Sequence, residues 1–347
     1  MNTPTWDPLN GGSIEPNVRN EFGTLKTAIL NPIATPGLYA HASGTDIGRM
    51  EIQFSQPYHN DKHKLLYAHQ RDLTERGVRI VHPHHPNLQP TIGNMLTYIG
   101  SDIYCRDFLG VVDDTAILTT LSSYRNDMRS YYERILEQIP KGRQIRTDDR
   151  FSWGNAILAD DTVLVGLEHQ SYLEEIHRRL ETQEFMSILG NVDQRHHGIR
   201  AMQTILEQIG GTRKLAVCSL ALNTDLDMVL APLPRKNREA PREALVSIDA
   251  VHPASIPTLA KHYDKLLPCT DDWRTLACNI LWLDPETPLV SAEATKTIRF
   301  LRGRGYNVQA RKTAELKSEA IGHEDGQSGG WRCVTGVLER ASDYDFD

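Results

Sequence analysis

The pattern of apolar and polar positions repeats along the chain at intervals of about 50 to 70 residues. Each repeat has a short β-rich run, a turn of Asp, Asn, Pro or Gly, a second β-rich run and an amphipathic helix. In the clearest copy the turn is Asp113-Asp114 and Pro140 ends the helix, and the three elements are expected at 108–112, 116–121 and 126–138. The chain therefore predicts an α/β protein built from repeated units.

The same order of elements recurs four more times. Further β-rich runs are expected at 25–30, 156–158, 163–167, 228–233, 244–248, 279–283 and 288–291, and helices at 61–75, 172–183, 198–209, 255–267 and 292–302. Two more β-rich runs follow the fifth unit, at 306–310 and 333–338. Because the last run is left over to pair with the first, five similar units favour a closed radial array over an open sheet. We expect one domain over 1–347, with units at 17–80, 102–145, 150–215, 220–268 and 275–340.

A generic α/β domain whose turns happen to look alike is the other interpretation of this pattern. A doubly wound sheet is disfavoured, because it would place phosphate-binding glycines after the first strand. Gly11-Gly12 lies before that strand, and the sequence contains neither GxGxxG nor GxxxxGK[ST].

The composition describes a globular chain and narrows the class of partner. The 347 residues are 39% hydrophobic and 24% charged, and 38 basic against 45 acidic residues give a net charge of -7. Without a polybasic block, nucleic acid and an anionic membrane are disfavoured as partners and a small molecule is favoured. No run of about 18 apolar residues is present and the first ten residues lack signal-peptide features, so we expect a cytoplasmic protein. The sequence leaves a homodimer open.

The cysteines are few, and their spacing matches no common framework. There are five of them, an odd number, and no two have CxxC spacing. A disulfide framework and a structural zinc site are therefore not expected, and no metal or other cofactor is assigned. The remaining question is which of the thiols is a nucleophile, among Cys105, Cys218, Cys269, Cys278 and Cys333.

Five short motifs follow one another in a fixed order along most of the chain. They are Asn20 to Lys26 (NEFGTLK), Arg106-Asp107 before an apolar run, Phe151 to Asn155 (FSWGN), Asp225-Leu226-Asp227 before VLAPL, and Gly329 to Cys333 (GGWRC). In this set the chain resembles the guanidino-group-modifying enzymes, the superfamily of amidinotransferases, arginine deiminases and dimethylarginine hydrolases. The resemblance implies a five-bladed αβ propeller, the pentein fold, with repeated ββαβ units around a central pocket.

The resemblance also implies roles for particular residues. Cys333 matches the thiol nucleophile, and Asp107 and Asp227 match carboxylates that bind the guanidinium group. The chemistry agrees, because carboxylates accept the N–H groups of a planar cation side by side, and a neighbouring cation favours the thiolate. Attack on the central carbon would release an amine and leave an amidino-thioether, which water resolves in a hydrolase and a second amine resolves in an amidinotransferase. Arg106 is expected to pair with a carboxylate.

Three positions depart from the family pattern. Asp225 replaces the histidine that serves as general acid and base, and Ser152 and Asn155 replace two acids of the FSWGN segment. We expect Ser152, Asn155 and Trp153 to line the substrate pocket, with Trp153 as a wall. The loss of two acids favours a guanidine, amidine or ureido compound that is less charged than plain arginine or shaped differently from it.

Two groups are candidates to replace the missing histidine. Asp225 and Asp227 would share one face of a strand, where two close carboxylates would let one keep a proton at neutral pH. His323, ten residues before Cys333 in a glycine-bearing loop, is the alternative acid and base. The competing class is a non-catalytic relative that keeps the propeller and binds a ligand or a partner protein.

Overall fold

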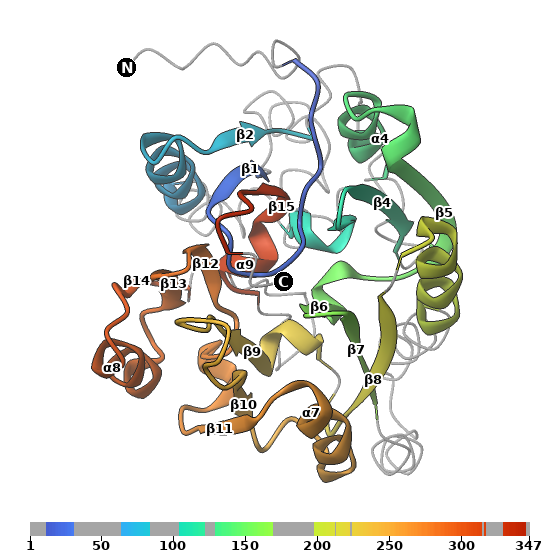
Figure 1. Ribbon diagram of the computed structural model, residues 1–347. Helices are drawn as coiled ribbons and strands as arrows, with labels where there is room; N and C mark the ends of the chain where they lie inside the picture. Colours follow the sequence, from blue (N-terminus) through green and yellow to red (C-terminus); the bar gives the residue numbers. More distant parts are fainter. Residues whose placement is uncertain are drawn as a thin grey trace, which may run out of the picture.

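The fold is a five-bladed αβ propeller, seen in a computed structural model of the chain (Figure 1). The structure describes residues 12–30, 64–83, 104–121, 129–168, 198–211, 213–222, 224–313, 316 and 329–344. Five three-stranded sheets are arranged around a common centre, and each sheet is one blade. This architecture confirms the radial array that the repeats predicted.

The blades follow one another in chain order, except that the first blade takes its third strand from near the C-terminus. Its strands are β1 (Leu25–Ile29), β2 (Arg79–Val81) and β15 (Gly336–Arg340). The second and third blades contain β3 (Leu109–Val112), β4 (Thr115–Thr120), β5 (Gln144–Arg150), β6 (Ala156–Ala159), β7 (Thr162–Glu168) and β8 (Lys214–Leu220). The fourth and fifth contain β9 (Leu230–Leu233), β10 (Glu243–Ser247), β11 (Lys265–Cys269), β12 (Leu281–Asp284), β13 (Thr287–Ser291) and β14 (Gln309–Arg311).

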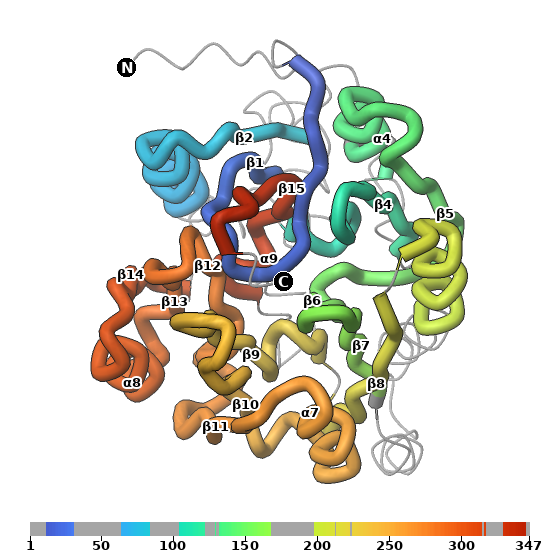
Figure 2. The backbone as a smooth tube through the Cα atoms, in the orientation of Figure 1, coloured from blue at the N-terminus to red at the C-terminus, as the bar shows by residue number. Residues whose placement is uncertain are grey.

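All five blades have the same strand pairing. The middle strand pairs antiparallel with the inner strand and parallel with the outer one, as β4 does with β3 and β5. In the first blade β1 is the middle strand, and its inner partner β15 comes from the C-terminal end, with Ala28 opposite Val337. The expected pairing of the last β run with the first is confirmed, and Figure 2 shows β15 lying beside β1.

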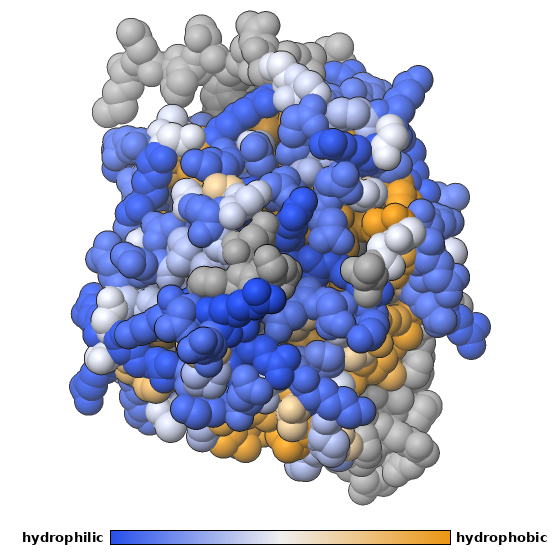
Figure 3. Space-filling view, in the orientation of Figure 1, coloured by the Kyte–Doolittle hydropathy of each residue, from blue (hydrophilic) through white to orange (hydrophobic). Residues whose placement is uncertain are grey.

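Helices lie on the outside of the sheets and connect middle strands to outer strands (Figure 1). They include α4 (Arg129–Glu137), α7 (Ile256–His262), α8 (Thr295–Gly303) and the helical stretches 64–75 and 198–209. In α4, Tyr132, Ile135 and Leu136 are buried at helical spacing, because that face packs on the sheet. No helix in the described ranges combines the length and the apolar character needed to cross a bilayer, and Figure 3 shows a mostly hydrophilic face.

Two local predictions near the centre are wrong. The β run expected from Cys333 begins three residues later, because Trp331–Val334 form the one-turn helix α9 and β15 starts at Gly336. Asp225 and Asp227 do not share a strand face either. Asp225 is the N-cap of the 3-10 helix η5 (Leu226–Met228), so the two side chains are related by a tight turn and not by strand alternation.

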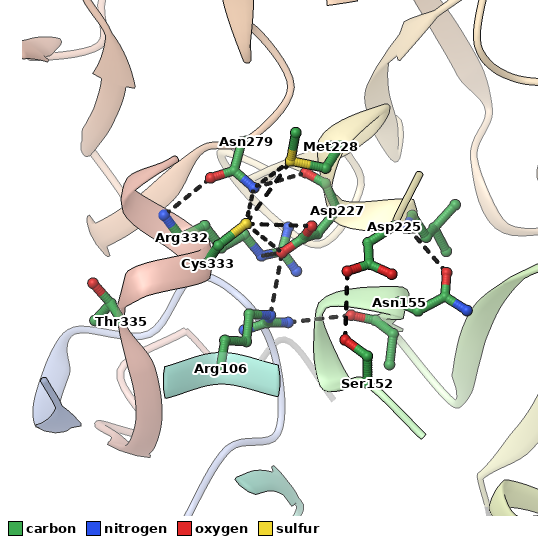
Figure 4. A network of polar contacts seen from close by, with 12 residues as sticks. Arg106, Ser152, Asn155, Asp225, Asp227, Met228, Asn279, Arg332, Cys333 and Thr335 are labelled. Carbon is green, nitrogen blue, oxygen red and sulfur yellow. Dashed lines mark hydrogen bonds and ion pairs between the residues drawn. The ribbon is translucent and has the colours of Figure 1, made fainter. Parts of the chain in front are cut away.

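A pre-strand segment of about one turn precedes each inner strand, and these segments meet at the centre of the propeller. They are η1 (Cys105–Asp107), η4 (Trp153–Asn155), η5, the loop 276–280 and α9. Contacts join η1 to η4, η4 to η5, and α9 to η1. Each pre-strand segment carries a polar side chain: Asp107, Asn155, Asp227, Asn279 and Cys333. Figure 4 shows Asp227, Asn279 and Cys333 close together.

Candidate active site

Cys333 lies on α9 at the centre of this ring of pre-strand segments (Figure 4). Its side chain is 6% exposed, and its sulfur lies 3.0 Å from Asn279 Nδ2 and 3.8 Å from both carboxylate oxygens of Asp227. The sulfur of Met228 is 3.8 Å away. The thiol is thus held between an amide that donates to it and a carboxylate that can accept its proton.

Asn279 is fixed by two further bonds. Its Oδ1 accepts the backbone N–H of Arg332 at 3.1 Å, and its Nδ2 lies 3.3 Å from the carbonyl oxygen of Asp227. Gly330 allows this approach, since a Cβ there would come within 2.4 Å of Asn279 Oδ1. Asn279 therefore connects the fourth blade, the fifth blade and α9 at the thiol.

Three aspartates face the region in front of the thiol. Asp227 is fully buried, Asp107 is 6% exposed, and Asp225 is half-buried. Asp107 Oδ1 and Asp225 Oδ2 each lie 2.9 Å from the point where a Cβ on Gly154 would stand, so these two carboxylates flank that glycine. A glycine at this position leaves room for the carboxylates of Asp107 and Asp225 to lie close together, and neighbouring carboxylates are what a planar, multiply donating cation requires.

The pKa values of the thiol and of Asp227 reflect this crowding. Burial raises the pKa of Cys333 well above its ordinary value, and the negative charges of Asp227 and Asp107 raise it further. Burial also raises the pKa of Asp227 to about 7, although Arg332 and Arg106 act in the opposite direction. A bound cation would reverse these effects, because positive charge favours both the thiolate and the carboxylate.

Two arginines close the floor of the site. Arg106 Nε and Arg332 Nε lie 3.5 Å and 3.9 Å from Asp227 Oδ2, and their Nη2 atoms lie 3.4 Å and 2.8 Å from Glu21 Oε1. Burial alone would raise the pKa of Glu21, but the arginines outweigh it and lower that pKa to about 2. The expected pairing of Arg106 with a carboxylate is confirmed, and this buried cluster fixes the back of Asp227.

The two departures in FSWGN occupy different positions. Ser152 Oγ lies 3.4 Å from Asp225 Oδ2, so Ser152 contacts one of the three aspartates. Asn155 is buried and bonds backbone groups, donating to the Gly166 carbonyl at 2.8 Å and accepting from the Leu226 N–H at 3.1 Å. Asn155 therefore joins η4 to η5 and aligns the segment that carries Asp225 and Asp227.

Trp153 is buried and packs against Phe151 and Gly110. Its ring packs edge-on against Phe151 and covers Gly110, where a Cβ would overlap the indole at 2.0 Å. With Glu21 and Arg106 it lines a small cavity near the arginine floor. The structure thus associates Trp153 with the floor of the site, whereas His323, the alternative acid and base, lies outside the described residues.

A buried histidine supports α9 from the first blade's helix. His69 Nδ1 lies 3.2 Å from Arg311 Nη1 and Nε2 lies 3.0 Å from Thr335 Oγ1. Because a guanidinium group can donate but not accept, Nδ1 is the acceptor and Nε2 carries the hydrogen that reaches Thr335. Thr335 in turn donates to the Trp331 carbonyl at 2.7 Å, which ties this chain of bonds to the helix that holds Cys333.

Sequence reasoning brought Asp107, Asp225, Asp227 and Cys333 into one site but missed Asn279, Met228 and Glu21. Asn279 had a usable signal, since it occupies the same place before its inner strand as Asp107 and Asp227 do before theirs. Glu21 belongs to the NEFGTLK motif, which carried the resemblance without indicating a role for the acid. No group of three or more described His, Cys, Asp or Glu residues is arranged to hold a metal ion.

Comparison with known proteins gives similarity at the level of structure. No family model matches the sequence, and no curated protein matches it. The fold is similar to the inosamine-phosphate amidinotransferase StrB1 from Streptomyces griseus, with a TM-score of 0.64 and 17% identity over 96% of this chain and 99% of that one. For SxtG, an amidinotransferase from Microseira wollei in the saxitoxin biosynthetic pathway, the TM-score is 0.59 and the identity 14%, over 95% of this chain and 98% of that one. For DDAH from Pseudomonas aeruginosa, complexed with citrulline, the TM-score is 0.55 and the identity 18%, over 84% of this chain and 94% of that one.

Proposed function

We propose that this protein is a guanidino- or amidino-group-modifying enzyme that forms a covalent amidino-thioether on Cys333. One observation carries the proposal: the thiol of Cys333 and the carboxylates of Asp107, Asp225 and Asp227 gather on neighbouring pre-strand segments. The similar folds of amidinotransferases and of a dimethylarginine hydrolase support the same chemistry. The substrate is an arginine-like small molecule with a guanidine, amidine or ureido group.

The first step is recognition of the cation. Asp227 accepts N–H groups at the back of the pocket, and Asp107 and Asp225 accept them from the two sides of Gly154. Ser152 adjusts the charge and direction of Asp225, while Asn155 holds the turn that carries it. These roles follow the positions of the side chains around the thiol.

The second step is attack by sulfur. The thiol gives its proton to the Asp227 carboxylate 3.8 Å away, while Asn279 Nδ2 donates to the developing thiolate. The thiolate adds to the central carbon of the bound cation. The bond to the leaving amine then breaks as a carboxylic acid supplies the proton that the amine needs, and an amidino-thioether remains.

The proton reaches the leaving amine through the pair of Asp225 and Asp227. Asp227 has a pKa raised to about 7, so it can carry a proton at neutral pH, and Asp225 is the more exposed of the two. Water or a second amine then attacks the thioether carbon, gives a proton to the freed carboxylate and releases Cys333 as the thiolate. Replacing His323 by Ala tests the alternative acid and base, because the loss of the basic limb of the pH profile would assign the role to His323.

Intact-protein mass spectrometry after incubation with a panel of guanidines and amidines tests the proposal. We expect a mass increase that maps to Cys333 by peptide analysis, is absent from Cys333→Ser, and is retained in Cys218→Ser, which changes a buried thiol elsewhere. Product analysis with and without an added primary amine separates hydrolysis from transfer.

The competing function is ligand binding without turnover. It is favoured by one observation: the described side-chain partners of the Cys333 sulfur are Asn279, Asp227 and Met228, and none of them is a histidine. Saturable binding of a guanidine with no adduct on Cys333, together with slow labelling of Cys333 by a thiol reagent at pH 6 to 7, would decide for this function.

A further inference from the structure

The helix that carries the thiol, α9, is a single turn and needs support from other elements. Val334 N–H bonds the Gly330 carbonyl at 3.2 Å, and Thr335 N–H bonds the Arg332 carbonyl at 3.3 Å. One turn fixes many backbone torsions for few hydrogen bonds, so it is unstable by itself. The position of Cys333 therefore depends on the side chains that hold the two ends of α9.

The two ends of α9 are held by different blades. Near its start, Asn279 Oδ1 accepts the N–H of Arg332 at 3.1 Å. At its end, His69 Nε2 lies 3.0 Å from Oγ1 of Thr335, the C-cap residue. Thr335 Oγ1 donates to the Trp331 carbonyl at 2.7 Å and so spans the whole turn. In Figure 4, Thr335 stands on the side of the thiol away from Asn279.

Every polar atom in the second support has a defined role. His69 Nδ1 accepts from Arg311 Nη1 at 3.2 Å, because a guanidinium group only donates, so Nε2 carries the hydrogen that Thr335 accepts. Burial and Arg311 lower the pKa of His69 to about 3, which keeps the ring neutral at neutral pH. His69 and Thr335 are fully buried, so the loss of either would leave a buried polar atom of the other unpaired.

Ring contacts attach the same support to the first residue of α9. The rings of His69 and Trp331 have centroids 4.8 Å apart, and the Arg311 guanidinium lies 5.8 Å from the centroid of the Trp331 ring. Asp72, from the same helical stretch as His69, pairs with Arg311. The helical stretch 64–75 of the first blade and β14 of the fifth therefore hold α9 together.

We propose that His69 is a positioning residue for Cys333, which acts through Thr335 to hold α9 where the sulfur meets Asn279. The Asn279 N–H stabilises the thiolate only where it reaches the sulfur, which lies 3.0 Å from Nδ2. When His69 or Thr335 is replaced, α9 shifts, the thiolate loses this bond, and the thiol ionises at a higher pH. The inference rests on the proposed function in taking Cys333 as the nucleophile, but it concerns the thiol before any substrate binds.

The pH dependence of thiol reactivity tests the role of Thr335. The rate at which iodoacetamide labels Cys333 is followed on tryptic peptide 333–340 between pH 6 and 10. In Thr335→Val we expect the curve to move up by about 0.7 pH units, so that labelling at pH 7 is about fivefold slower. Thr335→Ser keeps the hydroxyl and should restore the wild-type curve. Thr204→Val is the matched control, because Thr204 makes the same kind of bond to the Arg200 carbonyl, at 3.2 Å, on an exposed helix face.

A double variant tests whether His69 acts through Thr335. His69→Phe keeps a ring against Trp331 but has no nitrogen, and it should move the curve as Thr335→Val does. Because both changes break one chain of bonds, the double variant should move the curve no further than either single variant. All of these variants keep the charged groups around the sulfur: Asp107, Asp225, Asp227, Arg106 and Arg332.

The outcomes separate positioning from a general loss of stability. Urea denaturation at pH 7 shows which variants are folded, and if His69→Phe is not, Thr335→Val with its serine rescue decides alone. An unmoved curve in Thr335→Val, a curve that serine does not restore, or additive shifts in the double variant would overturn the proposal. Moved curves without an adduct from any guanidine would reject the proposed function and leave the positioning role standing.

Discussion

The side-chain amide of Asn279 points its nitrogen at the Cys333 sulfur from 3.0 Å, and its oxygen holds the backbone of Arg332 beside that cysteine. One residue thus orients the helix that carries the thiol and stabilises the negative sulfur. A hydrogen bond to a charged group contributes about 1.5 to 3 kcal/mol. The fifth blade therefore takes part in the site through an amide.

Replacing Asn279 by Asp should slow the reaction of Cys333. The carboxylate keeps the acceptor for the Arg332 N–H but removes the donor to sulfur and adds a negative charge, so the thiolate loses stabilisation. We expect the rate of Cys333 labelling at pH 7 to fall by about 10-fold or more. Asn237→Asp, which changes an exposed turn amide, is the matched control and should leave the rate unchanged.

The repeated order of β-rich run, turn, β-rich run and helix in the sequence was sufficient to predict the propeller. The turns at Asp113 and Asp160 were recognised from their Asp-Asp pairs, and both first aspartates have a positive φ, which Asp adopts more readily than most residues. The outer strands are a different case. β5 has the sequence QIRTDDR, with mostly exposed positions, because a parallel edge strand gains its order from the middle strand and not from an alternating apolar face.

The sequence predicted only those residues of the site that belong to the five motifs. Asp107, Asp227 and Cys333 came from the resemblance, and the structure brings them together on three pre-strand segments. The sequence did not predict the strand-to-helix change at Cys333, because α9 is held by contacts distant in sequence, such as the bond between His69 and Thr335. Glu21 and Arg332 are 311 positions apart, so their pairing has no local signal.

Replacing Gly154 by Ala should damage the pocket while leaving most of the fold intact. The new Cβ would lie 2.9 Å from both Asp107 Oδ1 and Asp225 Oδ2, so the two carboxylates must separate. We expect adduct formation or ligand affinity to fall by about 10-fold or more, since about 1.4 kcal/mol corresponds to each factor of ten. Gly142→Ala, where a new Cβ meets nothing within 4 Å, is the control, and an equal effect of both variants would contradict the prediction.

Replacing Glu21 by Gln should destabilise the whole protein. The change removes one of the two carboxylates, Glu21 and Asp227, that the buried Arg106 and Arg332 share, and removing one partner of a buried ion pair costs about 3 to 5 kcal/mol. Urea denaturation of the variant should show that loss at pH 7. Glu15→Gln, which breaks an exposed pair with Arg143, should change stability by less than about 1 kcal/mol.

Two buried groups make opposite contributions to the pH dependence of stability. Burial, together with Arg311, lowers the pKa of His69 to about 3, so between about pH 3 and 6.5 the unfolded chain binds a proton that the folded chain does not. Stability from His69 therefore increases with pH in that range. Asp227, with a pKa raised to about 7, binds a proton in the folded chain from about pH 4 to 7, so its contribution decreases with pH.

Single substitutions should separate these two contributions. Asp227→Asn removes the contribution that decreases with pH and keeps the His69 contribution that increases with pH. From pH 4.5 to 6.5, the unfolding free energy of this variant should therefore rise relative to wild type by about 1.4 kcal/mol per pH unit. The unfolding free energy of His69→Gln should fall relative to wild type by a similar amount per pH unit. The unfolding free energy of the double variant should change with pH in the same way as that of wild type. Urea denaturation at pH 4.5, 5.5 and 6.5 measures all four slopes. Parallel curves for wild type and Asp227→Asn would mean that Asp227 remains ionised in the folded protein, and Asp227 could then not carry the proton from Cys333 to the leaving amine.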